Sequence, residues 1–569
     1  MKNVAGLVGV LLGGMWALGC APSLSQFEGR KRDLAPDSNV TAGILVRGST
    51  PESLAALLQR HSSAEFRVLN EAHQMYEVFG LSLNDVQGEL PQAEVSQNTF
   101  IDNDFETPAP SERLQLYANE KPPGELQKCV EGANPPQAVI KILVGQDALQ
   151  KRLLFENDEI RLSASGSLNK EFPGQPLRMA WVVMAPRGAL ETEQIVSAAE
   201  LTYKTVALGG YGIGLIVQDS RNVCSLDILE FAVTANRKYL GRNPANNEEL
   251  GKIDLSKMPH LRRLHAQESW LLSQGQGIVI AVIDSGVNFN HVALRDNILL
   301  NENEIPNNNL DDDGNGFKDD EVGWDFNFND SSPFDDVGHG SHVAGLAASA
   351  AMGMAKKAKI LPIKALGAFG GDVGSVAAAI RYAVDRKANI INLSLGSHSA
   401  PKRELLEAIG YAEAKGVLIL AAAGNGHPMT GIGLNTDQFP VYPAGLTNNN
   451  ILNVAALGKN DNLTTYSNFG ADSVDVAAPG GEREEMLLSA FLENPSGLQF
   501  VEMSGTSMAT PIVAGMAAQV WALNPKFTAL EVKARLMSSG PELAKLKNLV
   551  QSGRGVDALG ALLPSHNLL

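Results

Sequence analysis

Three residues whose types suit nucleophilic catalysis lie far apart in the chain, each beside small residues. Asp284 directly follows an apolar run, His339 lies between two glycines, and Ser507 lies in the run Gly-Thr-Ser-Met-Ala-Thr-Pro. Acyl transfer needs a nucleophile, a base that takes its proton and a group that orients the base. A serine hydroxyl, an imidazole and a carboxylate fill these roles if the fold brings them together.

Each position also has a simpler structural explanation. An aspartate after a strand can cap the next turn, and a serine before an apolar helix can be an ordinary N-cap. A helix start at Ser507 suits catalysis as well, because its free N–H groups and dipole favour negative charge. His342 lies about one turn after His339, but the chain contains no His-Glu-x-x-His run, so zinc binding by this pair is disfavoured.

Asn425 is the candidate for a fourth role. It ends the run Ala-Ala-Ala-Gly-Asn, which follows the apolar segment 417–420. Its side-chain amide can donate a hydrogen bond to the oxyanion of the intermediate, alongside the backbone N–H of Ser507. The alternative is a turn asparagine, because Gly424 and Gly426 flank it.

Together, these four segments resemble the subtilisin-like serine proteases in motif, order and spacing, over about residues 261–560. The order Asp, His, Ser along the chain differs from that of chymotrypsin-like enzymes and α/β-hydrolases. The resemblance implies a serine endopeptidase that hydrolyses proteins or peptides through an acyl-enzyme. It assigns the catalytic triad to Asp284, His339 and Ser507, and the oxyanion donor to Asn425.

The resemblance also implies where substrate binds. Ser394, Leu395 and Gly396 would line the cleft and pair with the substrate backbone, and residues 442–444 would help form the S1 pocket. One departure from the family pattern is Ile512, where many relatives have His after the proline. Nothing about this position suggests a loss of catalysis.

The elements that must position these residues alternate between strands and helices from about Leu261. The run 277–283 is continuously apolar, and 359–363, 390–394 and 417–420 are three more strand-like runs that are mostly apolar. Such runs are typical of strands buried on both faces of a parallel sheet. Amphipathic helical runs lie between them, so we expect a doubly wound α/β peptidase domain over 261–565, with its ligand site at the carboxyl ends of the strands.

Residues 40–105 predict a smaller α+β domain. Strand-like and helix-like runs follow one another in the order β-α-β-β-α-β, which predicts a ferredoxin-like arrangement. That order resembles the inhibitory propeptide of subtilisin-like proteases, and its place before a protease domain supports the comparison. The same arrangement serves many other functions.

Residues 128–238 predict an all-β sandwich similar to PKD-like or other immunoglobulin-like domains, followed by an Asn- and Glu-rich linker over 239–260. Cys129 and Cys224 flank nearly all of this region. A disulfide between them would stabilise the domain by about 4–5 kcal/mol in the chain-entropy model. The alternative is two unrelated buried thiols.

An acidic segment between the aspartate and histidine motifs suggests a calcium site. Asp311, Asp313, Asn315 and Asp319 occupy positions 1, 3, 5 and 9 of a calcium-loop pattern with glycine at position 6. Position 12 is Val322, so the segment is not an EF-hand. Subtilisin-like enzymes often hold structural calcium in such loops, and the alternative is a solvated acidic turn. The chemistry itself requires no cofactor.

Composition and the N-terminus indicate an exported protein. The net charge is −17, from 63 acidic and 46 basic residues, which argues against nucleic acid as a partner. Residues 1–20 predict a signal peptide whose end, Ala-Leu-Gly-Cys20, resembles a bacterial lipobox. We therefore expect a lipid anchor at Cys20 in the cell envelope, at the outer membrane on its periplasmic or outer side. An ordinary secretory signal is the alternative.

Two other functional hypotheses remain compatible with the sequence. One is an inactive adhesion or scaffold protein that kept a protease fold, against which the complete set of catalytic residues argues. The other is a protease that cleaves only itself to release its N-terminal domains.

Overall fold

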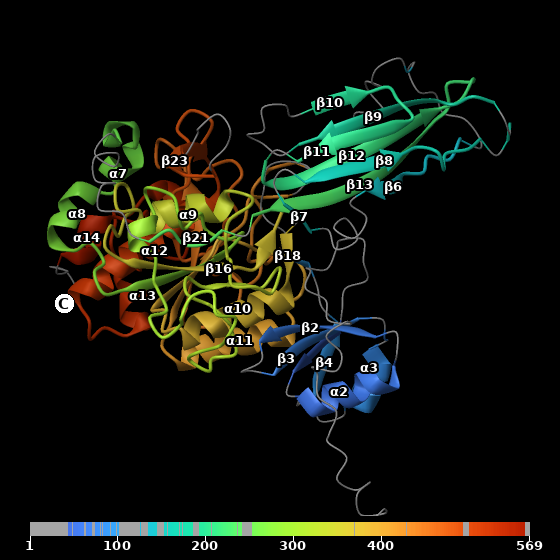
Figure 1. Cartoon of the computed structure of the whole chain (residues 1–569). Coiled ribbons are helices and arrows are strands. Elements are labelled where there is room, and N and C mark those ends of the chain that lie inside the picture. Colours follow the sequence, from blue (N-terminus) through green and yellow to red (C-terminus); the bar gives the residue numbers. More distant parts are fainter. Residues whose placement is uncertain are drawn as a thin grey trace, which may run out of the picture. The chain divides into compact units, whose positions relative to one another are not determined.

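The computed structural model describes residues 44–101 with short gaps, residue 126, residues 135–241 with gaps, and residues 253–563 except 369, 428–429 and 493–499. The chain divides into two compact units, the first comprising residues 39–98 of the described region and the second beginning at Thr99. Cys20 and Cys129 lie outside the described residues. Figure 1 labels the elements in chain order.

The first unit is a four-stranded antiparallel sheet with two helices. Its strands are ordered β2-β3-β1-β4, so the two strands that are central in space come first and third in the sequence. Ile44, Leu57 and Phe66 are among the apolar side chains that form its core. The elements are β1 (Ile44–Arg47), α2 (Pro51–Arg60), β2 (Glu65–Asn70), β3 (Met75–Phe79), α3 (Leu83–Glu89) and β4 (Glu94–Gln97).

The second unit begins with a region of β-strands in two sheets. One has the order β10-β9-β12-β13-β7 and the other β11-β8-β6. The aromatic side chains of Trp181, Tyr211 and Phe231 are fully buried, and the last two rings stack with centroids 5.3 Å apart. The strands are β6 (Lys141–Val144), β7 (Leu153–Phe155), β8 (Glu159–Ser163), β9 (Arg178–Met184), β10 (Glu193–Val196), β11 (Glu200–Lys204), β12 (Gly209–Gln218) and β13 (Cys224–Thr234).

A seven-stranded parallel sheet, with the order β15-β16-β14-β19-β20-β21-β22, forms the centre of residues 261–563, which the sequence predicts to lie in the peptidase domain and which we call the catalytic region. Alternate residues of β14 face opposite sides, and Ile280, Ala281, Val282 and Ile283 are all fully buried, as the continuous apolar run predicts. The strands are β14 (Val279–Asp284), β15 (Trp324–Asp325), β16 (Lys359–Lys364), β19 (Ile390–Leu393), β20 (Leu418–Ala422), β21 (Ile451–Leu457) and β22 (Val476–Pro479).

Helices pack on this sheet in two pairs (Figure 1). Helix α12 contacts α9 and the strands from β14 to β22, whereas α10 contacts α11, β14 and β16. Asp372 caps α10 by accepting a hydrogen bond from the N–H of Ser375. The main helices are α9 (His339–Ala348), α10 (Val373–Asp385), α11 (Arg403–Ala414), α12 (Thr506–Leu523) and α13 (Ala529–Met537), with short α7 (Pro259–Arg263), α8 (Ala266–Leu272) and α14 (Ala558–Leu562).

Residues 237–240, which follow β13, are bound to the catalytic region rather than free of it. The N–H of Arg237 donates to Ser332 Oγ at 3.2 Å, and the N–H of Leu240 donates to Asn290 Oδ1 at 2.9 Å. The hydroxyl of Tyr239 donates to the Arg295 carbonyl at 2.9 Å. The expected linker over 239–260 thus begins with a docked segment, and it also contains the short helix η2 (Leu255–Lys257).

Two small sheets flank the catalytic region. Strands β17 (Leu366–Gly367) and β18 (Gly370–Asp372) form a hairpin directly after β16, and β5 (Phe100–Ile101) pairs antiparallel with β18. The second is the hairpin of β23 (Leu487–Ala490) and β24 (Phe500–Met503), just before α12. Within the described part of the chain, no helix is long and apolar enough to cross a membrane.

Candidate active site

Asp284 and His339 form a buried pair at the carboxyl end of β14. Asp284 is the last residue of that strand and His339 the first of α9, and their Oδ1 and Nδ1 atoms are 2.7 Å apart. The N–H of Ser285 also donates to Asp284 Oδ1 at 2.7 Å. Because Oδ1 faces one ring nitrogen, the carboxylate fixes the imidazole orientation and favours the tautomer in which Nε2 carries no proton and can act as a base.

Glycines on both sides of His339 make this approach possible. A Cβ atom on Gly340 would lie 2.0 Å from the carbonyl oxygen of Gly286, so only glycine lets the start of α9 pack against the turn after Asp284. Gly338 has φ of +96°, a conformation that favours glycine, and a Cβ there would meet the ring of Phe491. The sequence run Gly-His-Gly is therefore a packing requirement of the aspartate–histidine pair.

Ser507 lies in the first turn of α12 and is tied to the loop after β19. Its Oγ lies 3.4 Å from the carbonyl oxygen of Ser394, and Ser394 Oγ in turn donates to the Ser507 carbonyl at 2.8 Å. In a regular helix, that carbonyl would accept the N–H of residue 511, but Pro511 has none. The proline thus leaves the carbonyl of Ser507 available to the neighbouring loop.

Asn425 lies beside the turn that precedes Ser507. Its Oδ1 accepts hydrogen bonds from the N–H of Thr506 at 2.8 Å and from the Thr506 hydroxyl at 3.0 Å. A Cβ atom on Gly505 would lie 3.4 Å from Asn425 Nδ2 and 3.6 Å from the backbone nitrogen of Ser507. The Asn425 amide nitrogen and the Ser507 backbone nitrogen therefore both lie close to Gly505. Sequence reasoning missed Thr506, although it stands inside the Gly-Thr-Ser run.

The segment expected to line the substrate cleft follows β19. Leu395 is fully buried, so its side chain belongs to the core. A Cβ on Gly396 would lie 2.6 Å from Val441 Cγ1, which explains glycine there. Ser397 and Tyr442 exchange two backbone hydrogen bonds of 2.9 Å, so this segment runs beside the one expected to form the S1 wall.

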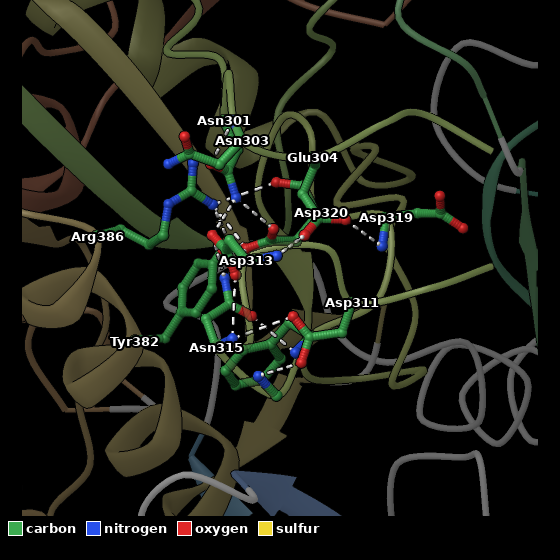
Figure 2. Close-up of polar contacts among 12 residues, drawn as sticks. Asn301, Asn303, Glu304, Asp311, Asp313, Asn315, Asp319, Asp320, Tyr382 and Arg386 are labelled. Carbon is green, nitrogen blue, oxygen red and sulfur yellow. Dashed lines mark hydrogen bonds and ion pairs between the residues drawn. The ribbon is translucent and has the colours of Figure 1, made fainter. Parts of the chain in front are cut away.

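The acidic loop after β14 gathers three carboxylates. Oxygen atoms of Glu304, Asp311 and Asp313 lie within 4.8 Å of one another (Figure 2). Asp319 points away from them in Figure 2, and its carboxylate accepts the N–H groups of Asn308 and Asn309 instead. Glu304 was missed from sequence because it lies seven positions before the loop pattern, and only the fold brings it there.

Asn315 and the buried Asp320 lie beneath this group. The side-chain amide of Asn315 donates to Asp313 at 3.2 Å and to Asp320 at 3.1 Å, while its Oδ1 accepts the N–H of Phe317. Asp320 also accepts hydrogen bonds from Tyr382 and Arg386, at 2.6 and 2.7 Å. The loop is thus anchored to α10 and to the residue after it (Figure 2).

Burial weakens the acidity of two carboxyls in and beside this group, those of Glu304 and Asp320. Burial raises the pKa of Glu304, and the charges of Asp320 and Asp313 raise it further, against the backbone hydrogen bonds that lower it. Burial likewise raises the pKa of Asp320, although Arg386 opposes this. Three closely spaced carboxylates, of which Glu304 has a raised pKa, fit a cation, and Ca²⁺ prefers such oxygen ligands.

The fold and these contacts combine a doubly wound parallel α/β sheet with a buried aspartate–histidine pair and a serine at a helix start. Residues 275–555 match the model of the subtilase family, Peptidase_S8. The chain is 35% identical over 263 residues to thermitase from Thermoactinomyces vulgaris, covering 45% of this chain and 79% of that protein. The chain therefore belongs to the subtilase family and is a subtilisin-like serine endopeptidase.

Two further relatives have similar identity. Subtilisin Savinase from Lederbergia lenta is 32% identical over 285 residues, which are 49% of this chain and 88% of that protein. The thermophilic serine proteinase of Bacillus sp. (strain AK1) is 36% identical over 258 residues, which are 44% of this chain and 54% of that protein.

Proposed function

We propose that this endopeptidase hydrolyses peptide bonds with Asp284, His339 and Ser507 as its triad. The 2.7 Å contact between Asp284 and His339 carries the proposal, together with the link between Ser394 and Ser507 at the start of α12. Ser507 attacks the scissile carbonyl while His339 takes the hydroxyl proton, and Asp284 stabilises the resulting imidazolium. Asn425 and the N–H of Ser507 donate to the oxyanion.

The second half of the reaction reuses the same residues. His339 gives its proton to the leaving amine, and a water molecule, deprotonated by His339, then hydrolyses the acyl-enzyme. Substrates are proteins or peptides whose extended backbone pairs with residues 394–396. Family resemblance favours apolar residues at P1.

The first unit acts as a propeptide that regulates the protease. Its element order and its strand order β2-β3-β1-β4 support a ferredoxin-like domain of the kind that inhibits subtilisin-like enzymes. The chain directly after this unit supports the same role, because β5 pairs with β18. Strand β18 follows β16, the neighbour of the strand that ends at Asp284.

The strands of 141–234 form an immunoglobulin-like sandwich held by a disulfide between Cys129 and Cys224. Their arrangement in two antiparallel-rich sheets and the buried Trp181 support the sandwich. Cys224 opens β13, where Gln218 Nε2 donates to its Sγ at 3.3 Å. Alkylation under denaturing conditions, with and without reductant, tests the bridge by mass spectrometry.

Glu304, Asp311 and Asp313 would hold a structural calcium ion, which would neutralise their charges and brace the loop. The protein is exported and attached to the cell envelope through a lipid on Cys20. The Ala-Leu-Gly-Cys20 end of the signal-like segment supports this localisation. Mass spectrometry of the purified N-terminus distinguishes a lipidated cysteine from an ordinary signal cleavage.

Replacing the nucleophile tests the proposed chemistry. We expect Ser507→Ala to abolish cleavage of casein and labelling by a fluorophosphonate, while the protein keeps its unfolding transition. Casein cleavage by the purified Ser507→Ala protein would refute the assignment. Peptide-library profiling of the wild type beside this variant would define the P1 preference, and mass spectrometry of both would show whether maturation depends on the same serine.

A further inference from the structure

A lysine lies buried directly beside the aspartate–histidine pair. Lys364 ends β16, is aligned with Asp284 across the parallel strands β14 and β16, and has no exposed surface. Lysine is almost never fully buried unless its charge is paired, because desolvating an ammonium costs several kcal/mol. Its retention at this position therefore requires specific partners.

The two partners of Lys364 belong to the two segments that carry the pair. Lys364 Nζ donates to the carbonyl of Ser285 at 2.8 Å, in the turn immediately after Asp284. It also donates to Asp336 Oδ1 at 2.6 Å, in the loop three residues before His339. The Lys364 ammonium thus links the turn after Asp284 to the loop before His339.

A second hydrogen-bond network connects the same two segments. Ser285 Oγ donates to Asp335 Oδ1 at 2.9 Å and accepts the N–H of Gly340 at 3.0 Å. Asp335 also accepts the N–H groups of Gly338 and Ser341, both at 2.8 Å. The start of α9 is therefore fixed to the turn after Asp284, but among the described residues this network contains no full positive charge.

The charges that face Lys364 are all negative. They are Asp325 at the end of β15 and Asp335 and Asp336 before α9, and all three are buried. Burial disfavours the ammonium form, but Asp336 and Asp325 outweigh this, so the pKa of Lys364 is raised. Lys364 therefore stays charged across the working pH range.

We propose that Lys364 is a positioning residue whose ammonium holds the Asp284 turn against the His339 loop and sets the electrostatic environment of the pair. The inference rests on the proposed roles of Asp284 and His339. A cation close to an imidazole disfavours its protonation, and an anion favours it. Lys364 thus offsets the surrounding carboxylates and keeps His339 available as a base.

Lys364→Met tests this role, because methionine keeps an unbranched apolar chain without the charge. We expect kcat to fall about 10- to 100-fold, as for other small displacements of catalytic groups, with KM within about twofold. The apparent pKa of the acid limb in the pH profile of kcat/KM should rise by about 0.5–1 pH unit. The reason is that the carboxylates, no longer balanced by the Lys364 ammonium, favour the imidazolium form of His339. Fluorophosphonate titration would give the fraction of active enzyme.

Lys533→Met is the matched control. Lys533 on α13 also pairs with one aspartate, Asp475 at 2.8 Å, and with one backbone carbonyl, that of Ile451. The Lys533→Met variant therefore also loses an ion-paired lysine, but not one beside the Asp284–His339 pair. We expect no change in the acid limb. If Lys364→Met matches Lys533→Met in both kcat and acid limb, the proposal is refuted.

Asp336→Asn provides a second, isosteric test if Lys364→Met does not fold. It removes the negative half of the ion pair and leaves the ammonium, so the acid limb should move downward, opposite to Lys364→Met. A general loss of stability in both variants would not shift the two acid limbs in opposite directions. An unchanged or upward limb in Asp336→Asn overturns the inference, whereas an active Ser507→Ala protein would overturn the proposed function itself.

Discussion

Asn425 Oδ1 accepts hydrogen bonds from both the backbone N–H and the side-chain hydroxyl of Thr506. Two donors on one oxygen fix the orientation of the amide, because a flipped amide would place its NH₂ group against them. Nδ2 is thereby held on the side of Gly505 and the Ser507 nitrogen. Thr506 thus fixes the orientation of the amide that we propose as the oxyanion donor.

We expect Asn425→Ala to lower kcat with little change in KM, because the lost hydrogen bond forms only as charge develops. The expected loss is about 10²- to 10³-fold, the magnitude known for this donor in a subtilisin. Steady-state kinetics on a peptide substrate would measure it. Asn450→Ala, which removes a buried amide that donates to the Val417 carbonyl, is the control for general loss of packing. Equal effects on kcat in both variants would contradict the oxyanion role.

Glu304→Gln should affect thermal stability in opposite directions with and without calcium. The pKa of Glu304 is raised in the folded protein, so its ionisation costs stability as pH rises through that pKa when no cation is bound. At pH 7.5 in chelator, the variant should therefore melt at a higher temperature than its parent. In millimolar calcium it should melt at a lower temperature, because a ligand is lost. The Ser507→Ala background prevents autolysis.

A melting temperature of the parent that does not respond to chelator would count against the calcium site. Asp319→Asn serves as a comparison, because Asp319 accepts backbone N–H groups of its own loop rather than joining the three carboxylates. We expect it to lower stability similarly in both conditions. A crossover in this variant as well would show that the site is wrongly assigned.

His260→Leu should reduce the loss of stability in mild acid. Burial, with a smaller effect of Arg263, lowers the pKa of His260 to about 3, and an unfolded histidine titrates near 6.5. Because the unfolded state binds the extra proton, stability is lost as pH falls below about 6.5, at up to about 1.4 kcal/mol per pH unit for one such group. Denaturant unfolding at pH 8 and pH 5 would measure the difference.

His342 has the same lowered pKa of about 3 and remains as an internal reference in that experiment. The expected result for His260→Leu is a smaller gap between the two pH values, with about one proton fewer taken up on unfolding. An unchanged gap would mean that His260 is protonated, or solvated, in the folded protein.

Tyr239→Phe and Tyr239→Ala should separate two contacts that the Tyr239 side chain makes in the docked segment 237–240. The first removes the hydroxyl and its hydrogen bond to the Arg295 carbonyl, keeps the ring, and should cost about 1 kcal/mol. The second also removes the edge-on contact with Phe289, whose ring packs on Phe334, and should cost about 2–4 kcal/mol. Denaturant unfolding of both variants in the Ser507→Ala background would test this. Equal stability of Tyr239→Ala and the parent would show that the segment is not docked in solution.

Sequence reasoning located the catalytic candidates because their signals are local. Continuous apolar runs predicted β14 and β19, and small residues around His339 and Ser507 marked close backbone approaches. The structure brings Asp284 to His339 and Asn425 to the turn before Ser507.

Other features depend on pairs of residues far apart in sequence and could not be predicted. Glu304 joins the acidic group only because the loop folds back on itself. Lys364 follows an apolar run, and a lysine at the end of a strand is normally exposed to solvent. In the structure Lys364 is fully buried, and its charge is paired with that of Asp336. Residues 237–240 are held by hydrogen bonds to the side chains of Asn290 and Ser332. Neither residue lies in a sequence motif that predicts this contact.

Pro511 has a consequence for how the enzyme responds to substrate. Because the helix offers no amide to the Ser507 carbonyl, that carbonyl takes its position from Ser394 Oγ, at the head of the segment on which a peptide is expected to lie. The proposed nucleophile and the segment expected to hold the peptide are therefore joined by a direct hydrogen bond that does not pass through the rest of α12. We expect a peptide that displaces residues 394–396 to displace the Ser507 backbone with them.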